Sequence, residues 1–186
     1  GIASIIGLSV AQTASRFTSN YISIGDENKS RGFSKQCLLL IILISFLFFF
    51  ILMVLSDDIS TMFFHNEIDS AWLTLSALNL VSFSITQVLI GIMWGQNRIP
   101  TASSYQIIAA LLRNILSISM VIYGMGVFGA ILGFLLADLM INLLLIRNLL
   151  GFFKGSTEYS DSKDLFQFVI PLFISSFIIF FQLNLD

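Results

Sequence analysis

The chain has 186 residues, of which 56% are apolar and only 11% charged, and its nine basic and eleven acidic residues give a net charge of −2. An ordinary soluble domain carries roughly a quarter charged residues, so this chain has too few charges to cover a surface that faces water. The net charge and the absence of a basic tract argue against a nucleic-acid partner. The composition indicates an all-α integral membrane protein.

Charge-free runs mark the predicted spans, because a charge at the bilayer centre costs roughly 2.5–3.5 kcal/mol and a span needs about 20 apolar residues. The runs 36–56, 70–97 and 165–185 are long enough alone. The run 114–137 is either one helix or the inner halves of two. We favour two, since one helix would leave the apolar stretches 99–112 and 139–146 in water.

The chain is therefore expected to form a bundle of about six spanning helices. They are predicted near Gly1–Thr18, Cys37–Leu55, Ala71–Trp94, Ser104–Tyr123, Val127–Ile146 and Leu165–Leu185. The segment Ser56–Ser70 between the second and third helices is predicted to be a loop. Since the chain begins inside an apolar stretch and stops directly after a span, we expect a fragment.

Lysine and arginine positions predict the orientation, because basic residues collect in cytoplasmic loops. With this helix count, eight of the nine basic residues fall on one alternating side and Arg113 lies inside a span. The opposite loop, 56–70, holds no basic residue and four acids, Asp57, Asp58, Glu67 and Asp69. We interpret the basic side as cytoplasmic.

Residues typical of catalytic and metal sites are few. The single cysteine, Cys37, excludes an internal disulfide and a cysteine-ligated metal site, and we expect it at a helix end. The single histidine, His65, sits in the acidic loop, where a solvated loop is favoured over a weak cation contact. Asn28–Ser30 is a glycosylation sequon that should be unused on the cytoplasmic side. We therefore predict no metal, no cofactor and no enzyme activity.

Residues 124–129 match the pattern G-x-G-x-x-G, which in a dinucleotide site needs a strand before it and an acid about 20 residues beyond it. Here the preceding stretch has the length of a helix, and no acid stands at that distance. We interpret Gly124 and Gly126 as a tight outer turn. Small residues at four-residue spacing then predict close helix packing, namely Gly129, Gly133 and Ala137, and Ala3, Gly7, Ala11 and Ser15.

Polar side chains within the spans form the candidate site, because they are costly in hydrocarbon and usually face a cavity or a partner. Arg113 and Asp138 lie within roughly 2 Å in depth on helices joined by a tight turn, so we expect them to pair. The pair is either a static bridge or an arginine that is released to an anionic cargo. The candidate cavity residues are Arg113, Asp138, Asn79, Gln87, Gln106 and Asn142. For the amides, hydrogen bonding between helices stays an alternative.

The order of several weak motifs covers essentially the whole chain. They are Ser15–Phe17 at a helix end, Gly25–Lys29, Gly91 with Gln96–Arg98, then Gly126, Gly129, Ala130, Gly133 and Asp138, and Phe168–Phe173 opening a span. This order resembles the polysaccharide flippase branch of the multidrug/oligosaccharidyl-lipid/polysaccharide exporter superfamily, which is MATE-like. Gln96 and Asn97 depart from the pattern, because the family often has glycine in that connector.

The resemblance implies two pseudo-symmetric lobes of six helices, of which the chain would carry helices two to seven. Residues 1–146 would belong to the N-terminal lobe, 147–164 to a cytoplasmic linker and 165–186 to the first helix of the C-terminal lobe. It implies multi-pass placement in the cytoplasmic membrane and translocation of a lipid-linked oligosaccharide by alternating access. Membrane lipids and a coupling ion, Na⁺ or H⁺, are the further expected partners. Candidate head-group contacts on the cytoplasmic side are Arg16, Lys29, Arg31 and Arg98.

Two alternatives remain open. A drug or cation antiporter of the same superfamily would use Asp138 as a proton or sodium site. A membrane glycan polymerase would be expected to carry a large outer loop with catalytic arginine or histidine, whereas the longest outer loop predicted here, 56–70, has one histidine.

Overall fold

The structure is a computed structural model and describes residues 2–64, 70–158, 167, 169–171 and 174. Over this part the chain is helical and contains no strand. The elements are α1 (Ile2–Ser23), α2 (Glu27–Val54), α3 (Ser56–Phe64), α4 (Ser70–Gly95), α5 (Ile99–Met120), the π-helical turn η1 (Val121–Met125) and α6 (Gly126–Phe153). The predicted all-α class is confirmed.

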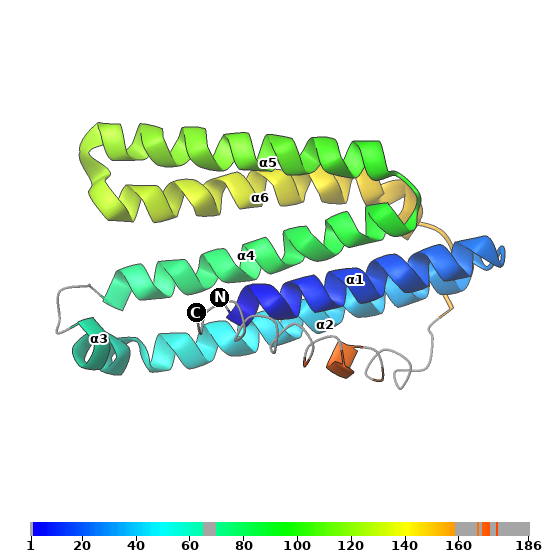
Figure 1. Ribbon diagram of the computed structural model, residues 1–186, viewed down its shortest axis with the longest axis horizontal. Coiled ribbons are helices and arrows are strands. Elements are labelled where there is room, and N and C mark those ends of the chain that lie inside the picture. Colours follow the sequence, from blue (N-terminus) through cyan, green and yellow to red (C-terminus); the bar gives the residue numbers. More distant parts are fainter. Residues whose placement is uncertain (1, 65–69, 159–166, 168, 172–173, 175–186) are drawn as a thin grey trace, which may run out of the picture.

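Helix α4 lies at the centre of the bundle (Figure 1). It packs against α1 and α2 on one side and against α6 on the other, while α5 packs mainly against α6. The short helix α3 lies beside the beginning of α4 at one end of the bundle. Helix α4 thus separates α1 and α2 from α5 and α6, and its side chains line the interfaces on both of its sides.

Three stretches of the described chain are long and apolar enough to cross a membrane: Glu27–Val54, Ala71–Gly95 and Ile99–Phe153. The third contains both α5 and α6, which η1 folds back on each other. Gly124 has φ +87° and Gly126 has φ +56°, conformations that glycine adopts without a steric cost. The two-helix interpretation of this region is therefore confirmed. Helix α1 forms as predicted but is not among the three stretches.

The two ends of the bundle differ in charge, as predicted. The connections from α1 to α2 and from α4 to α5 lie at one end together with the end of α6, and α3 and η1 lie at the other (Figure 1). Apart from Arg113, the basic residues that the structure describes are on the elements that meet at the first end, toward that end. They are Arg16, Lys29, Arg31, Lys35, Arg98, Arg147 and Lys154. Asp57 and Asp58 begin α3 at the opposite end.

Several predicted helix boundaries were too narrow. Helix α1 continues past Thr18 to Ser23, and α5 begins at Ile99 and not at Ser104. Helix α2 begins at Glu27, so Cys37 is fully buried inside it and not at its end, and α6 continues past Ile146 to Phe153. The charges ended the apolar runs of the sequence but did not end these two helices. In α2 the additional turns are capped by Asp26, whose side chain accepts a hydrogen bond from the Lys29 backbone N–H at 3.1 Å. This bond and the Lys29 ammonium lower the pKa of Asp26.

The prediction of a loop over Ser56–Ser70 was wrong in its first half, where α3 forms. Asp57 and Asp58 stand in the first turn of α3, where carboxylates are favoured by the helix dipole. His65, Glu67 and Asp69 lie outside the described residues. The predicted helix Leu165–Leu185 also lies largely outside them, so the division at residues 147–164 stays a prediction.

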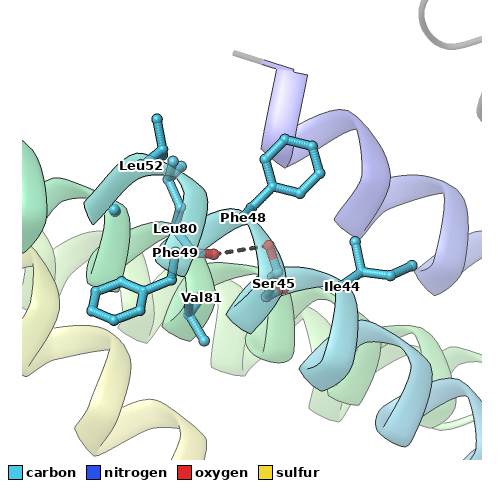
Figure 2. A pocket seen from close by; sticks show the side chains of 9 residues that line it. Ile44, Ser45, Phe48, Phe49, Leu52, Leu80 and Val81 are labelled. Carbon is cyan, nitrogen blue, oxygen red and sulfur yellow. Dashed lines mark hydrogen bonds between the residues drawn. The ribbon is translucent and has the colours of Figure 1, made fainter. Parts of the chain in front are cut away.

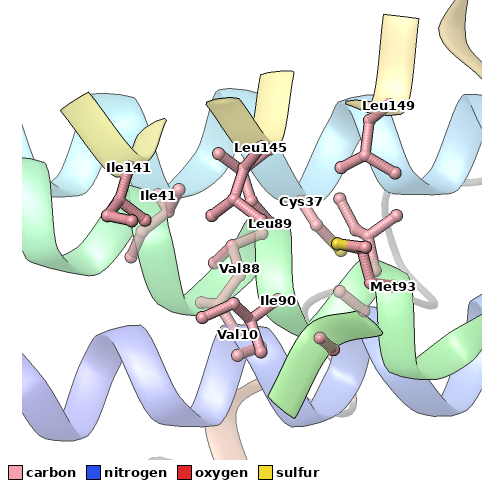
Figure 3. Packing of buried hydrophobic residues seen from close by; sticks show 14 of the residues in the cluster. Val10, Cys37, Ile41, Val88, Leu89, Ile90, Met93, Ile141, Leu145 and Leu149 are labelled. Carbon is pink, nitrogen blue, oxygen red and sulfur yellow. The ribbon is translucent and has the colours of Figure 1, made fainter. Parts of the chain in front are cut away.

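The core joins α1, α2, α4 and α6 through apolar side chains (Figure 3). Leu145 and Leu149 of α6, Cys37 and Ile41 of α2 and Val88 of α4 are fully buried within it. Since α4 supplies buried residues to both of its sides, the core also holds α4 in a defined position relative to α5 and α6. The charged pair described below depends on that position.

Small residues bring the helices together along two lines. A Cβ atom at Gly91 or Gly95 of α4 would lie 2.4 Å from the Ala11 carbonyl oxygen or 2.7 Å from that of Ser15 in α1. A Cβ at Gly133 of α6 would lie 2.6 Å from the Ser117 backbone in α5. The predicted close packing along α1 and α6 is confirmed.

Candidate functional site

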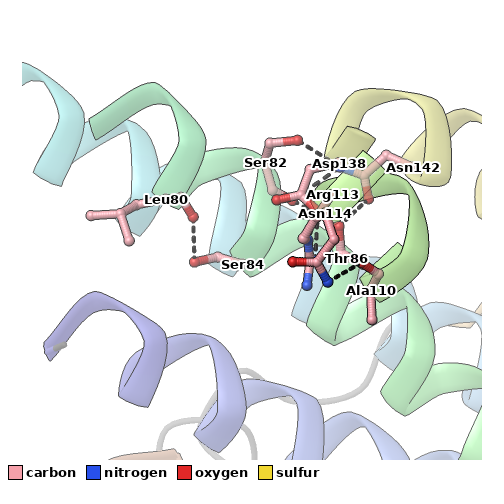
Figure 4. Close-up of polar contacts among 9 residues, drawn as sticks. All are labelled: Leu80, Ser82, Ser84, Thr86, Ala110, Arg113, Asn114, Asp138 and Asn142. Carbon is pink, nitrogen blue, oxygen red and sulfur yellow. Dashed lines mark hydrogen bonds and ion pairs between the residues drawn. The ribbon is translucent and has the colours of Figure 1, made fainter. Parts of the chain in front are cut away.

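The charged pair predicted from the sequence is present between α5 and α6 (Figure 4). Arg113 donates from Nε to Asp138 Oδ1 at 2.7 Å, and its Nη2 lies 2.6 Å from the same oxygen. The Asp138 side chain is 2% exposed, whereas Arg113 is 20% exposed. The carboxylate is thus enclosed by protein, and the guanidinium lies at the edge of the enclosure.

The guanidinium of Arg113 is held from a second side by α4. Its Cζ atom lies 4.9 Å from the centre of the Phe83 ring, which is cation–π distance. Arginine has five N–H donors, and the recorded ion pair uses Nε and Nη2. The remaining N–H groups leave Arg113 able to bind a second anion while it stays near Asp138.

An open pocket adjoins this pair. It is lined by Asn79, Leu80 and Phe83 of α4, Arg113 of α5, and Phe134 and Asp138 of α6. Within the described structure, Asn79 Oδ1 is buried and has no hydrogen-bond partner. A buried amide group without a partner is costly, so a ligand hydroxyl or a water that bonds to Asn79 would be stabilised there.

Asn142, one turn after Asp138, has a different role from the predicted one of lining the cargo cavity. Its Nδ2 donates to the Ser82 carbonyl oxygen at 2.9 Å and to Ser82 Oγ at 3.0 Å. Its Oδ1 accepts from Thr86 Oγ1 at 2.9 Å (Figure 4). Asn142 is buried and its hydrogen bonds run to α4, so here the alternative of hydrogen bonding between helices describes it best.

The profile of the family described as "Polysaccharide biosynthesis protein" matches residues 2–186. The chain belongs to the polysaccharide biosynthesis protein family. The resemblance inferred from the motifs is thereby confirmed, and the membership supports a role in polysaccharide biosynthesis. No curated protein and no solved structure matches the chain.

Two predicted cavity residues of this family member lie apart from the pocket. Gln87 on α4 and Gln106 on α5 are half-buried and do not line it. The sequence interpretation missed Phe83, which lies one turn after Asn79 on α4. The four-residue spacing places Phe83 on the same face of the helix as Asn79. Because the chain has 19 phenylalanines, however, the sequence alone did not single out this one.

The four candidate head-group contacts lie toward the basic end but do not form one open cationic cluster. Lys29 pairs with Asp26 at 3.1 Å, and Arg31 pairs with Glu27. Arg98 caps the start of α5 through its backbone, and Arg16 is exposed on α1. With Lys29 and Arg31 already compensated, the structure offers less cationic surface here than the sequence suggested.

A further hollow lies between α2 and α4 (Figure 2). Its lining has no charged side chain, and its polar members are Ser45 and Ser84. No group of three or more metal-ligating side chains occurs in the described ranges. The Arg113 pocket therefore remains the candidate site, since it combines a charge, an unpartnered amide oxygen and an opening.

Proposed function

We propose that the protein translocates a lipid-linked oligosaccharide across the cytoplasmic membrane by alternating access, with Arg113 as a contact for the anionic head group. The observation that carries this proposal is the half-open ion pair of Arg113 and Asp138 inside the helix bundle. Charged side chains in membrane segments usually mark substrate pathways. Membership of the polysaccharide biosynthesis protein family supports a glycan precursor as the cargo.

The chemistry of the pocket suits such a cargo. A polyprenyl pyrophosphate is anionic, and arginine binds phosphate oxygens through paired N–H groups. A sugar chain offers many hydroxyls, and Asn79 Oδ1 would accept a hydrogen bond from one of them. The lipid tail remains in the bilayer, so the pocket needs to hold only the polar part. On this proposal the protein performs no covalent step.

Asp138 serves as the resting partner of Arg113. An arginine left alone in this environment would be costly, and breaking a buried pair by removing one partner costs about 3–5 kcal/mol. When a phosphate enters, the free N–H groups of Arg113 engage it first, and the guanidinium can then turn from Asp138 toward the cargo. The pair thereby keeps the empty transporter stable without closing the site.

The antiporter alternative is less well supported by this geometry. A proton or a sodium ion at Asp138 would have to compete with the guanidinium, which binds Oδ1 through two nitrogens. Asp138 is also almost fully enclosed, and it shares the open pocket that it lines with the more exposed Arg113. Coupling to Na⁺ or H⁺ through another part of the protein is compatible with the proposal.

The direct test is transport by the complete protein reconstituted in liposomes. We expect it to move a fluorescent polyprenyl-pyrophosphate oligosaccharide from one leaflet to the other. Arg113→Gln should reduce the initial rate at least tenfold, because the head-group charge contact is lost. Transport of a cationic drug should be absent.

The matched control is Asn142→Leu, which removes polar contacts close to the pocket but leaves Arg113 in place. We expect it to lower the amount of folded protein and to preserve the rate per folded molecule. Drug transport, or an unchanged oligosaccharide rate with Arg113→Gln, would contradict the proposal.

A further inference from the structure

Helix α4 has a second open side, away from the Arg113 pocket. There α2 and α6 stand on either side of α4 and scarcely touch each other, which leaves a groove between them. Its floor is formed by Leu78, Val81, Ile85 and Leu89 of α4. Its polar floor and wall residues, Ser82 and Asn142, are already bonded to each other. The groove is therefore apolar along its length.

The groove continues toward the basic end of the bundle. Ile85 and Ile146 line both its inner section and the section that reaches Lys35 of α2 and Phe153 of α6. Several of its side chains are well exposed, such as Leu39 at 57% and Leu143 at 69%. Such a surface within membrane-spanning helices is covered either by lipid chains or by another apolar helix.

The length of the groove fits one leaflet. Helix α2 lines it from Lys35 to Phe46 and α4 from Leu78 to Leu89, each about 17 Å at 1.5 Å per residue. Half of the roughly 30 Å hydrocarbon core is about 15 Å. The α6 wall extends further, from Leu135 to Phe153, about 27 Å. Because two of the three walls end near mid-membrane, the groove fits a lipid chain better than a helix that spans the bilayer.

Lys35 supplies the charge at the open end. It is the last charged residue of α2 before the charge-free stretch, so it lies at the predicted cytoplasmic interface. Within the described structure no hydrogen bond or ion pair is recorded for Lys35, whereas Lys29 and Arg31 on the same helix are paired with acids. A lysine above an apolar groove is complementary to a phosphate head group with its acyl chain below.

We propose that the α2–α4–α6 groove is a binding site for one anionic phospholipid of the cytoplasmic leaflet, with its phosphate on Lys35 and an acyl chain along Ile85 and Ile146. The site lies on a different side of α4 from the Arg113 pocket and is independent of the transport proposal. A lipid bound there fills the space between α2 and α6, and thereby holds together two helices that have few mutual contacts.

The test is native mass spectrometry of the complete protein in detergent, titrated separately with phosphatidylglycerol and with phosphatidylcholine. We expect tighter binding of phosphatidylglycerol. Lys35→Ala should weaken phosphatidylglycerol binding about fivefold, since a cation at the membrane surface contributes about 1 kcal/mol to binding an anionic lipid. It should leave phosphatidylcholine binding unchanged. Arg147→Ala is the control, because it removes an exposed cation of α6 that does not line the groove.

A second pair of variants tests the groove itself. Leu39→Trp places a large ring at a lining position and should reduce binding of both lipids. Leu43→Trp alters an equally exposed leucine one turn away that does not line the groove, and should have no effect. Equal binding of the two lipids to the unaltered protein, or equal effects of Lys35→Ala and Arg147→Ala, would overturn the proposal. So would lipid binding that Leu39→Trp leaves unchanged.

Discussion

Gly91 of α4 lies directly against the backbone of Ala11 in α1, so that a Cβ atom at position 91 would stand 2.4 Å from the Ala11 carbonyl oxygen. Backbone atoms cannot move aside as a flexible side chain can. Gly91→Ala should therefore force α1 and α4 apart and destabilise the protein by about 1–3 kcal/mol. The thermal midpoint of the detergent-solubilised protein, followed by size-exclusion chromatography, measures this.

Gly151 provides the matched control for that substitution. It lies near the end of α6, and a Cβ there would meet nothing within 4 Å. Gly151→Ala should be neutral or stabilise the helix by about 0.5–1 kcal/mol. If Gly91→Ala and Gly151→Ala shifted the midpoint alike, the close approach of α1 and α4 would be disproved.

A second prediction concerns Asn97, where the resemblance to the flippase branch implies glycine. Asn97 has φ +58°, the Asn97 N–H bonds to the Trp94 carbonyl oxygen at 2.9 Å, and the Arg98 N–H bonds to that of Met93 at 3.0 Å. This is the Schellman arrangement that ends many helices. Gly25 occupies the same position between α1 and α2. Asparagine tolerates this conformation better than other residues that carry a Cβ, so the departure from the family pattern preserves the turn.

We expect Asn97→Gly to be neutral or slightly stabilising, and Asn97→Ala to cost about 1 kcal/mol. The midpoint of thermal unfolding of the two variants decides this. A destabilised glycine variant together with an unaffected alanine variant would show that the asparagine side chain, and not the backbone conformation, is what matters at this position.

A third prediction concerns the segment after α6, which docks on the start of α2. Ser156 Oγ donates to Asn28 Oδ1 at 2.7 Å, and the Glu158 N–H donates to the Asn28 carbonyl oxygen at 3.1 Å. Asn28→Ala removes the first of these bonds and the bond from Arg31 Nη1. Since each such bond contributes about 1 kcal/mol, trypsin should cleave after Lys154 a few times faster in inside-out vesicles.

Thr157→Ala is the control for this measurement, because its side chain has no recorded bond to α2 in the described structure. Its cleavage rate should equal that of the unaltered protein. An unchanged rate for Asn28→Ala would show that the segment is held by its backbone contact alone.

A fourth prediction is topological. In a Cys37→Ser background, single cysteines at Asp58 in α3 and at Glu158 after α6 should react with an impermeant maleimide from opposite faces of sealed cells. Both positions are exposed and lie at opposite ends of the bundle. If both cysteines react from outside, the arrangement of helices across the membrane is wrong.

The positions of the charged residues within the apolar runs could be interpreted from the sequence, because a charge buried in hydrocarbon is costly unless it is paired. Arg113 and Asp138 could be paired in advance because each interrupts an apolar run and the glycines between them require a turn. The start of α2 could not be found in this way, since its first turns carry charges and depend on capping by Asp26 and on the ion pair of Arg31 with Glu27. The end of α6 was missed because its turns beyond Arg147 are held by tertiary packing, with Leu149 buried in the core and Phe152 and Phe153 packed against it. Helix α3 was missed because its nine residues are too few to span a membrane and begin with two acids, Asp57 and Asp58.

The packing partners of individual side chains also could not be predicted from the sequence. Asn142 and Asn79 look alike as amides within apolar helices. Asn142 nevertheless bonds to Ser82 and Thr86 on a neighbouring helix, while Asn79 Oδ1 has no partner among the residues that the structure describes. Which amide is structural depends on the rotation of α4 against α6, which the core determines. Docking of Ser156 on Asn28 depends likewise on a contact between distant segments.

The most direct test of the central claim is a charge-exchange set at Arg113 and Asp138 in the complete protein, scored for both membrane abundance and oligosaccharide transport. The single variants Arg113→Asp and Asp138→Arg each leave like charges together and should lower abundance. The double variant should restore abundance, since the pair is re-formed, but it should not restore transport, since the cation then lies in the enclosed position of Asp138. Recovery of transport to the unaltered level by the double variant, or full transport in either single variant, would contradict the assignment of Arg113 as the cargo contact.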